Sequence, residues 1–344
     1  MLEIDGSFGE GGGQILRTSL AFSILTDIPV HVYNIRRNRP REGLAPQHLK
    51  TISALEALTG SKVEGNSISS TEIKFFPKKE FKRKITINIG TAGSITLLLQ
   101  SLMVILPFLE NKTIVGVYGG TDVPWSPQVD YLKEVSLPTL ERMGYRINIT
   151  KVIRGYYPEG GGYVEIEAFP IKKLKPIRID KFQKLEKIDG VSYSTNLPEN
   201  VTERQKKSAR GILYRDGITP NIKLQVEKDS SQRIGSGLFL FSKDKNSIIG
   251  DGALGARGKR AEEVGEEGAK QFLEKYYQGF DCHMSDQIVP YMALAEGSSS
   301  IFTKNTSHLE TNISILEKFY DIKVLWEDYM LEIEGIGFEN VYID

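Results

Sequence analysis

The sequence predicts an α/β fold (α+β in its smaller part) made of repeated units, and three observations support this. Helix and strand patterns alternate along most of the 344 residues. The tetrapeptide Glu-Gly-Gly-Gly occurs at 10–13 and again at 159–162, which is a hint of repetition, although short glycine clusters also recur by chance in such a chain. From Phe182 the sequence becomes more charged and loses the glycine clusters typical of phosphate loops. We therefore predict a core of 1–181 and 279–344 and an inserted small α+β domain at 182–278.

Helices and strands of the first part follow from hydrophobic periodicity. A stripe of Leu16, Leu20 and Ile24 predicts the first helix, and Pro46 suits the first turn of a second helix that continues to Leu58. Thr91 or Ser94 is expected to cap a buried helix at 95–109, and a further helix is predicted at 129–143. Strands are predicted at 2–4, 28–33, around Lys62, and at 72–76, 84–89, 113–117 and 163–169.

The inserted domain has its own pattern of elements. Strands are predicted at 184–196, 221–226 and 237–241, a basic helix at 199–215 and an acidic helix at 260–277. Because this segment is poor in glycine cradles, we expect the chemistry to lie outside it.

Composition excludes several classes of protein. The net charge is zero, so any nucleic-acid contact should be local rather than a coat over the whole surface. The single cysteine excludes a disulfide framework and suits a reducing compartment. The most apolar run, 95–109, is short for a bilayer span, and the chain starts with a strand pattern instead of a signal peptide. We therefore expect a cytoplasmic protein with no membrane contact.

A glycine-rich loop precedes the first helix. Residues 5–17 read Asp-Gly-Ser-Phe-Gly-Glu-Gly-Gly-Gly-Gln-Ile-Leu-Arg, which combines exposed backbone N–H groups with the positive end of a helix. No Gly-Lys-Ser/Thr follows, so a P-loop is excluded. A carboxylate among phosphate-binding amides needs a cation, so Glu10 is a candidate metal ligand and Arg17 a candidate phosphate ligand. A tight turn with a solvated glutamate is the alternative, and this loop alone does not separate the two.

A second loop is rich in arginine. Four arginines occur in the six residues 36–41, between a strand and a helix. Arg36 and Arg39 suit bidentate contacts with phosphate oxygens, and Gln47 lies at the start of the following helix. A solvated basic loop is the alternative, which the neighbouring glutamine makes less attractive.

The C-terminal segment 306–312 contains the third cluster. Ser307 and Glu310 form a Ser-x-x-Glu capping box, so His308 should lie in the first turn of a helix and off its apolar face. The helix dipole there favours the neutral imidazole, which can attack phosphorus. An exposed histidine without chemistry is the alternative. The other histidines have positions more typical of structural roles, namely His31, His48 and His283.

Taken together, these motifs resemble the RNA 3'-terminal phosphate cyclases along the whole chain. The matching residues, in order, are Asp5-Gly6, 9–17, Ile35-Arg36, Arg39, Gly43-Leu44, 47–49, 90–94, Gln100, 119–122, Tyr157-Pro158, 160–162, Asp286-Gln287, 307–309 and Thr311-Asn312. The resemblance implies three repeated βαβαββ-like units akin to those of enolpyruvyl transferases, with the small α+β insert before the last unit. It is compatible with a homodimer without fixing the oligomeric state.

The family's reaction would use ATP to convert an RNA 3'-phosphate into a 2',3'-cyclic phosphodiester, with release of AMP and diphosphate. By resemblance, His308 is the nucleophile that forms a histidine adenylate, and Glu10 holds a divalent metal, Mg²⁺ or Mn²⁺. Arg17, Arg36, Arg39 and Gln47 would bind phosphates of ATP or of the RNA end. The nucleotide pocket would further contain Gln100, Pro127, His283, Met284, Ser285, Asp286 and Gln287. His283 stands where many relatives have a tyrosine stacked on the adenine.

A non-catalytic, cyclase-like protein that acts in ribosomal RNA processing is the alternative function. That branch lacks the nucleophilic histidine, so His308 and the full set of arginines favour the ligase-type enzyme.

Overall fold

The computed structural model describes residues 1–9, 11–184 and 187–343. Within these ranges the strands form four sheets of four strands each. Three of the sheets share one topology, in which the first two strands of the unit pair in parallel and the other two add antiparallel. The strand orders are β1-β2-β4-β3, β5-β6-β8-β7 and β9-β14-β16-β15. The predicted threefold repetition of βαβαββ units is therefore confirmed.

The first unit contains β1 (Leu2–Asp5), α1 (Gly13–Thr26), β2 (Val30–Tyr33), α2 (Pro46–Thr59), β3 (Lys62–Glu64) and β4 (Ile73–Phe76). The second contains β5 (Lys84–Asn88), α3 (Ile95–Met103), η1 (Leu106–Phe108), β6 (Thr113–Gly119), α4 (Val129–Tyr131), η2 (Leu132–Ser136), α5 (Leu137–Glu141), β7 (Arg146–Ile153) and β8 (Gly162–Phe169). The third contains β9 (Arg178–Ile179), α8 (Cys282–Leu294), β14 (Glu296–Phe302), α9 (Ser307–Phe319), β15 (Lys323–Glu327) and β16 (Met330–Ile336).

The fourth sheet belongs to the segment between β9 and α8, which we call the inserted segment. Its elements are β10 (Asp189–Thr195), α6 (Asn200–Arg215), β11 (Asn221–Glu227), β12 (Gly235–Lys243), β13 (Ile248–Leu254) and α7 (Ala261–Gln278). Because β9 pairs in parallel with β14, this segment interrupts the third unit after its first strand. The insert was expected before the last unit, which was wrong by one strand, because β9 of that unit precedes the inserted segment.

The α/β units do repeat, but the two copies of Glu-Gly-Gly-Gly do not occupy equivalent positions in them. In the first unit the motif precedes α1, and the matching position of the second unit, between β5 and α3, is occupied by residues 90–94. The second copy, at 159–162, instead lies directly before β8. Ser94 caps α3 by accepting a hydrogen bond from the Leu97 N–H at 3.2 Å, which decides between the two predicted caps.

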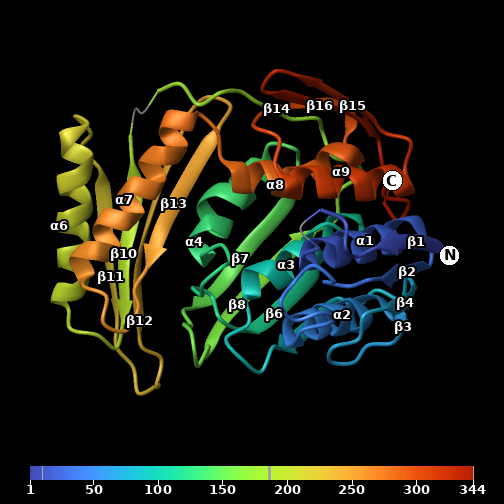
Figure 1. The fold of residues 1–344 in the computed structure, drawn as a ribbon, viewed down its shortest axis with the longest axis horizontal. Coiled ribbons are helices and arrows are strands. Elements are labelled where there is room, and N and C mark those ends of the chain that lie inside the picture. Colours follow the sequence, from blue (N-terminus) through green and yellow to red (C-terminus); the bar gives the residue numbers. More distant parts are fainter. Residues whose placement is uncertain (10, 185–186, 344) are drawn as a thin grey trace.

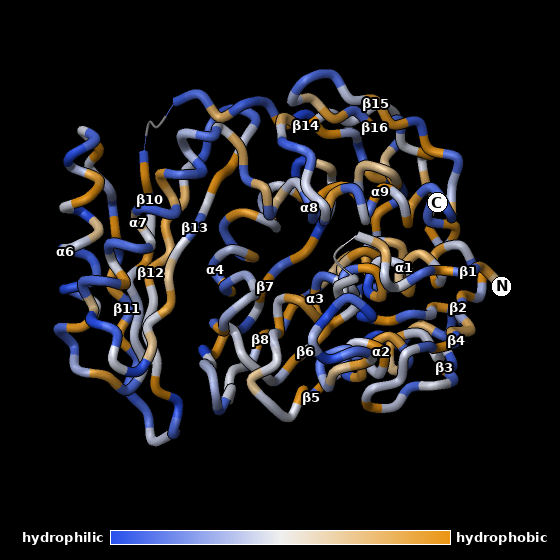
Figure 2. The backbone as a smooth tube through the Cα atoms, in the orientation of Figure 1, coloured by the Kyte–Doolittle hydropathy of each residue, from blue (hydrophilic) through white to orange (hydrophobic). Residues whose placement is uncertain are grey.

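The three sheets lie on the outside, and the helices α1, α3, α8 and α9 lie between them (Figure 1). This arrangement follows from the apolar faces of the helices, which join one hydrophobic cluster that includes Leu20, Leu98 and Leu316. The inserted segment has a separate cluster, and α6 and α7 cover one face of its sheet (Figure 1). Hydrophilic stretches occur along α6 at the outer edge (Figure 2). Every helix in the described ranges is too short or too polar to cross a membrane.

Candidate functional site

A cavity of about 850 Å³ lies where the three units meet the inserted segment. Its wall comes from elements far apart in the sequence: the start of α1, α3, the loop before α4, β13, α7, α8 and α9. Such a volume fits a nucleotide-sized ligand.

The glycine-rich loop reaches the cavity because its backbone is held at both ends. Asp5 begins the loop and its Oδ1 accepts hydrogen bonds from the N–H and hydroxyl of Ser7, at 2.9 and 2.7 Å. Gly9 has φ +57°, and a Cβ there would lie 2.4 Å from Thr311 Oγ1 on α9. Only glycine permits this approach. The loop is thus packed directly against the helix that carries His308.

At the start of α1, Arg17 and His48 lie side by side. A Cβ on Gly13 would be 2.4 Å from His48 Nε2 and 3.2 Å from an Arg17 guanidinium nitrogen. Burial lowers the pKa of Arg17 to about 10. Burial, and then the charges of Arg17 and Arg36, lower the pKa of His48 to about 4. His48 is therefore neutral at physiological pH, and its Nδ1 accepts the Ala45 N–H at 3.0 Å, which leaves the proton on Nε2.

Arg17 is half-buried and has no partner among the described residues. In the parts of the chain that the structure describes, no acceptor forms a hydrogen bond or ion pair with its guanidinium. A partly desolvated cation without an anion is unfavourable, and an anionic ligand at the N-terminus of α1 would remove part of that cost. The position is therefore an anion site in electrostatic terms.

His308 is the second residue of α9 and is half-buried on the cavity wall. The helix is capped by Thr306, whose Oγ1 accepts the Leu309 N–H at 3.1 Å. The predicted cap at Ser307 was wrong by one residue, because the helix starts at Ser307 itself. His308 nevertheless lies in the first turn and off the buried face, as expected. Its carbonyl accepts a hydrogen bond from Gln14 Nε2 at 3.2 Å.

Asn312 and Asp286, which both line the cavity, connect helices α1, α8 and α9 through hydrogen bonds. The buried Asn312 accepts from Thr18 Oγ1 at 2.9 Å and donates to the Asp286 carbonyl at 2.7 Å. The Asp286 carboxylate accepts from the capping residue Thr306 at 2.7 Å. These bonds hold the first turn of α9 in a fixed orientation, which a reacting histidine requires.

Asp281, just before α8, connects this helix to the inserted segment. Its carboxylate accepts the N–H groups of His283 and Met284, at 3.1 and 3.2 Å, and contacts Lys275 of α7 at 3.0 Å. Burial opposes ionisation of Asp281, but the charge of Lys275 prevails and lowers its pKa. The His283 ring is open to the cavity, yet the surrounding protein and then the Lys275 ammonium lower its pKa. Its ring meets Tyr131 edge to face, with centroids 6.2 Å apart.

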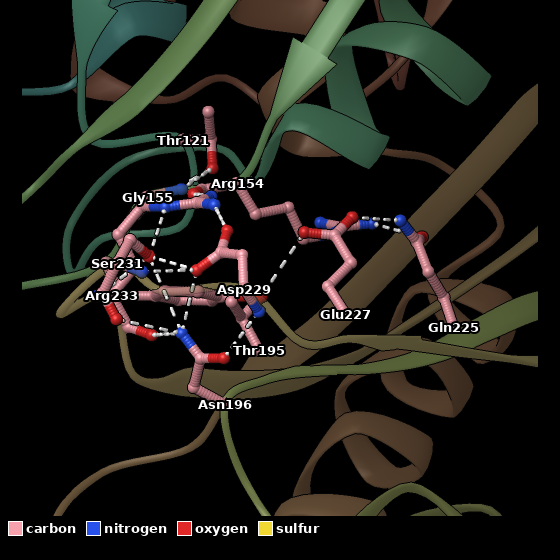
Figure 3. Close-up of polar contacts among 11 residues, drawn as sticks. Thr121, Arg154, Gly155, Thr195, Asn196, Gln225, Glu227, Asp229, Ser231 and Arg233 are labelled. Carbon is pink, nitrogen blue, oxygen red and sulfur yellow. Dashed lines mark hydrogen bonds and ion pairs between the residues drawn. The ribbon is translucent and has the colours of Figure 1, made fainter.

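A second connection to the inserted segment centres on Arg154, which follows β7. Its guanidinium pairs with Asp122 at 3.1 Å and Asp130 at 2.8 Å, and lies 3.6 Å above the ring of Tyr193 on β10. Figure 3 shows the neighbouring contacts, in which Gln225 of β11 accepts from Arg154 at 3.2 Å. The Arg154 carbonyl in turn accepts from Arg233. The ion pairs fix the guanidinium within the second unit, and the contacts with Tyr193, Gln225 and Arg233 join that unit to the inserted segment.

Most of the sequence-predicted residues share the cavity. Those on its wall are Arg17, Arg39, Gln100, Pro127, His283, Met284, Asp286, Gln287 and His308. Three others do not line it. Arg36 donates to the Gly43 carbonyl at 3.0 Å, Gln47 lies half-buried at the start of α2, and Ser285 is buried and donates to the Asp281 carbonyl at 3.0 Å.

The predicted metal ligand Glu10 lies outside the described residues. Among the residues that the structure does describe, no three His, Cys, Asp or Glu side chains gather into a metal-binding cluster. The described side chains alone therefore do not supply a divalent-metal site.

Sequence reasoning missed two features of the site. The sequence suggested a structural role for His48, but its Nε2–H faces the anion site. His48 and Arg17 are far apart in the sequence, so their proximity follows only from the folded structure. The inserted segment was expected to lie apart from the chemistry, but β13 and α7 contribute Asp251, Glu267 and Gln271 to the cavity wall. The sequence of these residues carries no motif that predicts this.

Comparison with known proteins agrees with this geometry. Residues 8–325 match the RTC family, described as RNA 3'-terminal phosphate cyclase. The chain is 44% identical to the RNA 3'-terminal phosphate cyclase of Pyrococcus abyssi (93% of both chains). It is 43% identical to that of Pyrobaculum aerophilum (98% of this chain, 99% of the other). It is also similar to the enolpyruvyl transferase NikO from Streptomyces tendae (TM-score 0.44, 9% identity, 97% of this chain, 48% of the other).

The matches extend over nearly the whole chain, and the cavity contains nine of the residues that the motifs predicted. The chain belongs to the RNA 3'-terminal phosphate cyclase family of enzymes.

Proposed function

We propose that this chain uses ATP to convert an RNA 3'-phosphate into a 2',3'-cyclic phosphodiester through a covalent adenylate on His308. The observation that carries the proposal is the position of His308 on the same cavity wall as Arg17, a half-buried cation that has no acidic partner among the described residues. A nucleophile beside a site for a polyanion is what attack on the α-phosphorus of ATP requires.

The order of steps follows from the chemistry of the RNA end. A phosphate monoester has no good leaving group, so the neighbouring 2'-hydroxyl displaces nothing from it. An imidazole nitrogen of His308 first attacks the α-phosphorus of ATP, and diphosphate leaves. An oxygen of the RNA 3'-phosphate then attacks the same phosphorus, so AMP passes to the RNA and His308 is regenerated. The 2'-hydroxyl finally attacks the 3'-phosphorus, loses its proton and expels AMP.

The phosphate contacts are assigned to the first unit. Arg17, Arg39 and the N-terminus of α1 line the cavity and would hold the triphosphate, because they combine two guanidinium charges with the backbone N–H groups at the start of a helix. Arg36 and Gln47 would support the phosphate site from behind the cavity wall, since neither lines the cavity and Arg36 donates to the Gly43 carbonyl. Glu10 is proposed to hold a divalent metal, Mg²⁺ or Mn²⁺, on the phosphates.

The adenosine part is assigned to the opposite wall. Pro127 and His283 are proposed to enclose the adenine, and the imidazole offers less stacking area than the tyrosine of many relatives. The remaining members of this wall are Gln100, Met284, Asp286 and Gln287, with Ser285 behind them. Gln287 already accepts the Ser136 hydroxyl at 2.9 Å, which orients its amide.

Conversion of an end-labelled RNA with a 3'-phosphate tests the proposal. With ATP and a divalent cation, the labelled RNA should be converted into a product whose 3'-phosphate is no longer removed by phosphatase. His308→Ala should abolish this conversion, whereas His31→Ala, at a surface histidine paired with Glu3 at 2.8 Å, should retain it. Conversion at the parental rate by His308→Ala would refute the mechanism.

No observation favours the non-catalytic function in ribosomal RNA processing as a second candidate. The single cysteine is consistent with action in the reducing cytoplasm.

A further inference from the structure

Trp125 occupies the edge of the cavity in an unusual way. It lies in the loop between β6 and α4, on the wall of the cavity, yet its side chain is 95% exposed. Its backbone has φ +60°, in the left-handed region that bulky side chains rarely adopt. A large apolar ring is therefore held in water, in an unfavourable backbone conformation, at the entrance of the site. Strain of this kind is typical of positions that contact a ligand.

The loop around Trp125 is fixed, so the exposure of the indole does not come from a loose chain. The Ser126 hydroxyl donates to the Val123 carbonyl at 3.0 Å. The Pro127 carbonyl accepts the Thr96 hydroxyl of α3 at 2.8 Å. Before the loop, the buried Asp122 pairs with Arg154 at 3.1 Å. The indole is consequently presented on a rigid support, which reduces the entropy lost when a ligand stacks on it.

Positive charge occurs on the inserted segment next to the same cavity. Leu254, Gly255 and Ala256 line the cavity, and the exposed Arg257 follows them directly. In the described part of the chain, no hydrogen bond or ion pair joins Arg257 to another residue. An exposed aromatic ring together with an unpaired cation is the combination that single-stranded nucleic acids favour.

We propose that Trp125 stacks on the base of the 3'-terminal nucleotide of the RNA. This inference rests on the proposed function. ATP can be enclosed by the cavity, but an RNA is a polymer and must cross the cavity edge to bring its last phosphate to His308. A ring at that edge therefore meets the RNA and not the adenine of ATP. Because every base offers a π-face, the contact should tolerate any terminal base.

Steady-state kinetics with RNA 3'-phosphates test this assignment. Trp125→Ala should raise the KM for RNA by about tenfold or more, since base–aromatic stacking has that magnitude. Trp125→Phe should recover much of the loss. Tyr277→Ala removes another exposed aromatic ring, one that is hydrogen-bonded to Asp216 at 2.6 Å and outside the cavity lining, and it should leave the KM near the parental value.

An RNA whose 3'-terminal residue is abasic sharpens the test. The parent enzyme should bind it more weakly than the normal RNA, and Trp125→Ala should no longer distinguish the two. An equal KM for normal RNA in parent and Trp125→Ala would overturn the inference while the cyclase function stands. A similar rise in the ATP concentration needed for self-adenylation would assign the ring to adenine and overturn it. Absence of cyclisation by the parent enzyme would instead reject the proposed function.

Tryptophan fluorescence reports on the contact without turnover. The chain has two tryptophans, so Trp326→Phe leaves Trp125 as the only one. Titration of this variant with RNA 3'-phosphate should quench its emission, and the abasic RNA should quench it much less. Equal quenching by both RNAs, or a change of oligomeric state in Trp125→Ala, would overturn the assignment and indicate a protein interface at this loop.

Discussion

At the scale of single residues, the anion site depends on two side chains, Arg17 and His48, and the charge of Arg17 lowers the affinity of His48 for protons. Arg17 and His48 lie together at the start of α1, and the Arg17 charge contributes to the low pKa of His48, about 4. A second positive charge would be costly there, so the histidine remains neutral and offers only its Nε2–H. The site therefore combines one permanent charge with one neutral donor.

This pair predicts a pH dependence of stability. An unfolded histidine titrates near 6.5, whereas His48 in the folded chain titrates near 4. As the pH falls from 6.5 to 4, the unfolded chain gains a proton that the folded chain does not, so the free energy of unfolding decreases. The loss is at most about 3 kcal/mol, and less where water reaches the ring.

Urea unfolding of the parent and of His48→Asn at pH 7 and pH 4.5 would measure this contribution. The asparagine carbonyl keeps an acceptor for the Ala45 N–H but does not titrate, so the variant should lose less stability in acid. Identical acid sensitivity of the two proteins would contradict the assignment.

Replacement of Arg17 tests the geometry of phosphate binding. Arg17→Lys keeps the charge, but an ammonium does not reproduce the two-pronged contact of a guanidinium. We expect self-adenylation to slow by about tenfold or more, because a charge-assisted hydrogen bond is worth roughly 1.5 to 3 kcal/mol.

Arg36→Lys is the matched comparison for Arg17→Lys. Arg36 already donates to the Gly43 carbonyl and lies outside the cavity lining, so the loss should be smaller. Rates of self-adenylation, measured without RNA at saturating ATP, would rank the two variants. A larger loss in Arg36→Lys than in Arg17→Lys would contradict the assignment of Arg17 to the phosphate site.

At the scale of elements, the first turn of α9 sets the orientation of His308. Thr306 both caps the helix and donates to the Asp286 carboxylate at 2.7 Å. Thr306→Ala should therefore cost about 1 to 2 kcal/mol of stability and slow self-adenylation. Thr306→Ser keeps the hydroxyl and should restore both properties. Equal behaviour of the alanine and serine variants in thermal unfolding and labelling would show that the cap does not position His308.

Elements with strong hydrophobic periodicity were predictable, and those without it were not. The stripes of α1 and α2 and the alternation in β8 indicated these elements directly. Strand β14 contains Ser298, Ser299 and Ser300, so it lacks the apolar alternation typical of strands. Its pairing with β9 and β16 comes from tertiary packing. The cap at Thr306 was missed because Ser307 and Glu310 offered an equally good local signal.

At the scale of the whole molecule, nine of the residues that the motifs singled out line the cavity, but no motif predicted the wall that the inserted segment supplies. The motif residues have recognisable types and spacings, whereas the wall of β13 and α7 is defined by where the inserted segment docks. That docking depends on the contacts of Arg154 with Tyr193 and Gln225, which are distant from it in the sequence, and on the contact of Lys275 with Asp281 across the end of the segment. Tertiary contacts of this kind produce no recognisable motif in the amino-acid sequence.

Arg154→Met tests the docking. Removal of the guanidinium leaves the buried Asp122 and Asp130 without a counter-charge, so the free energy of unfolding should fall by about 3 to 5 kcal/mol. Arg233→Met, in the same network but paired with Asp229 nearer the surface, should cost about 1 kcal/mol or less. Chemical denaturation of both variants would compare them, and equal losses would show that the buried ion pairs of Arg154 stabilise the fold no more than the pair of Arg233 with Asp229 does.

The identity of the residue that carries AMP tests the central claim most directly. The protein is incubated with ATP labelled on the α-phosphate and a divalent cation, without RNA, and the labelled peptide is sequenced. We predict one adenylated residue, His308, in a bond that mild acid breaks and alkali spares, and that RNA with a 3'-phosphate, but not a 3'-hydroxyl, discharges. Label that survives acid, or that maps to any residue other than His308, would contradict the account.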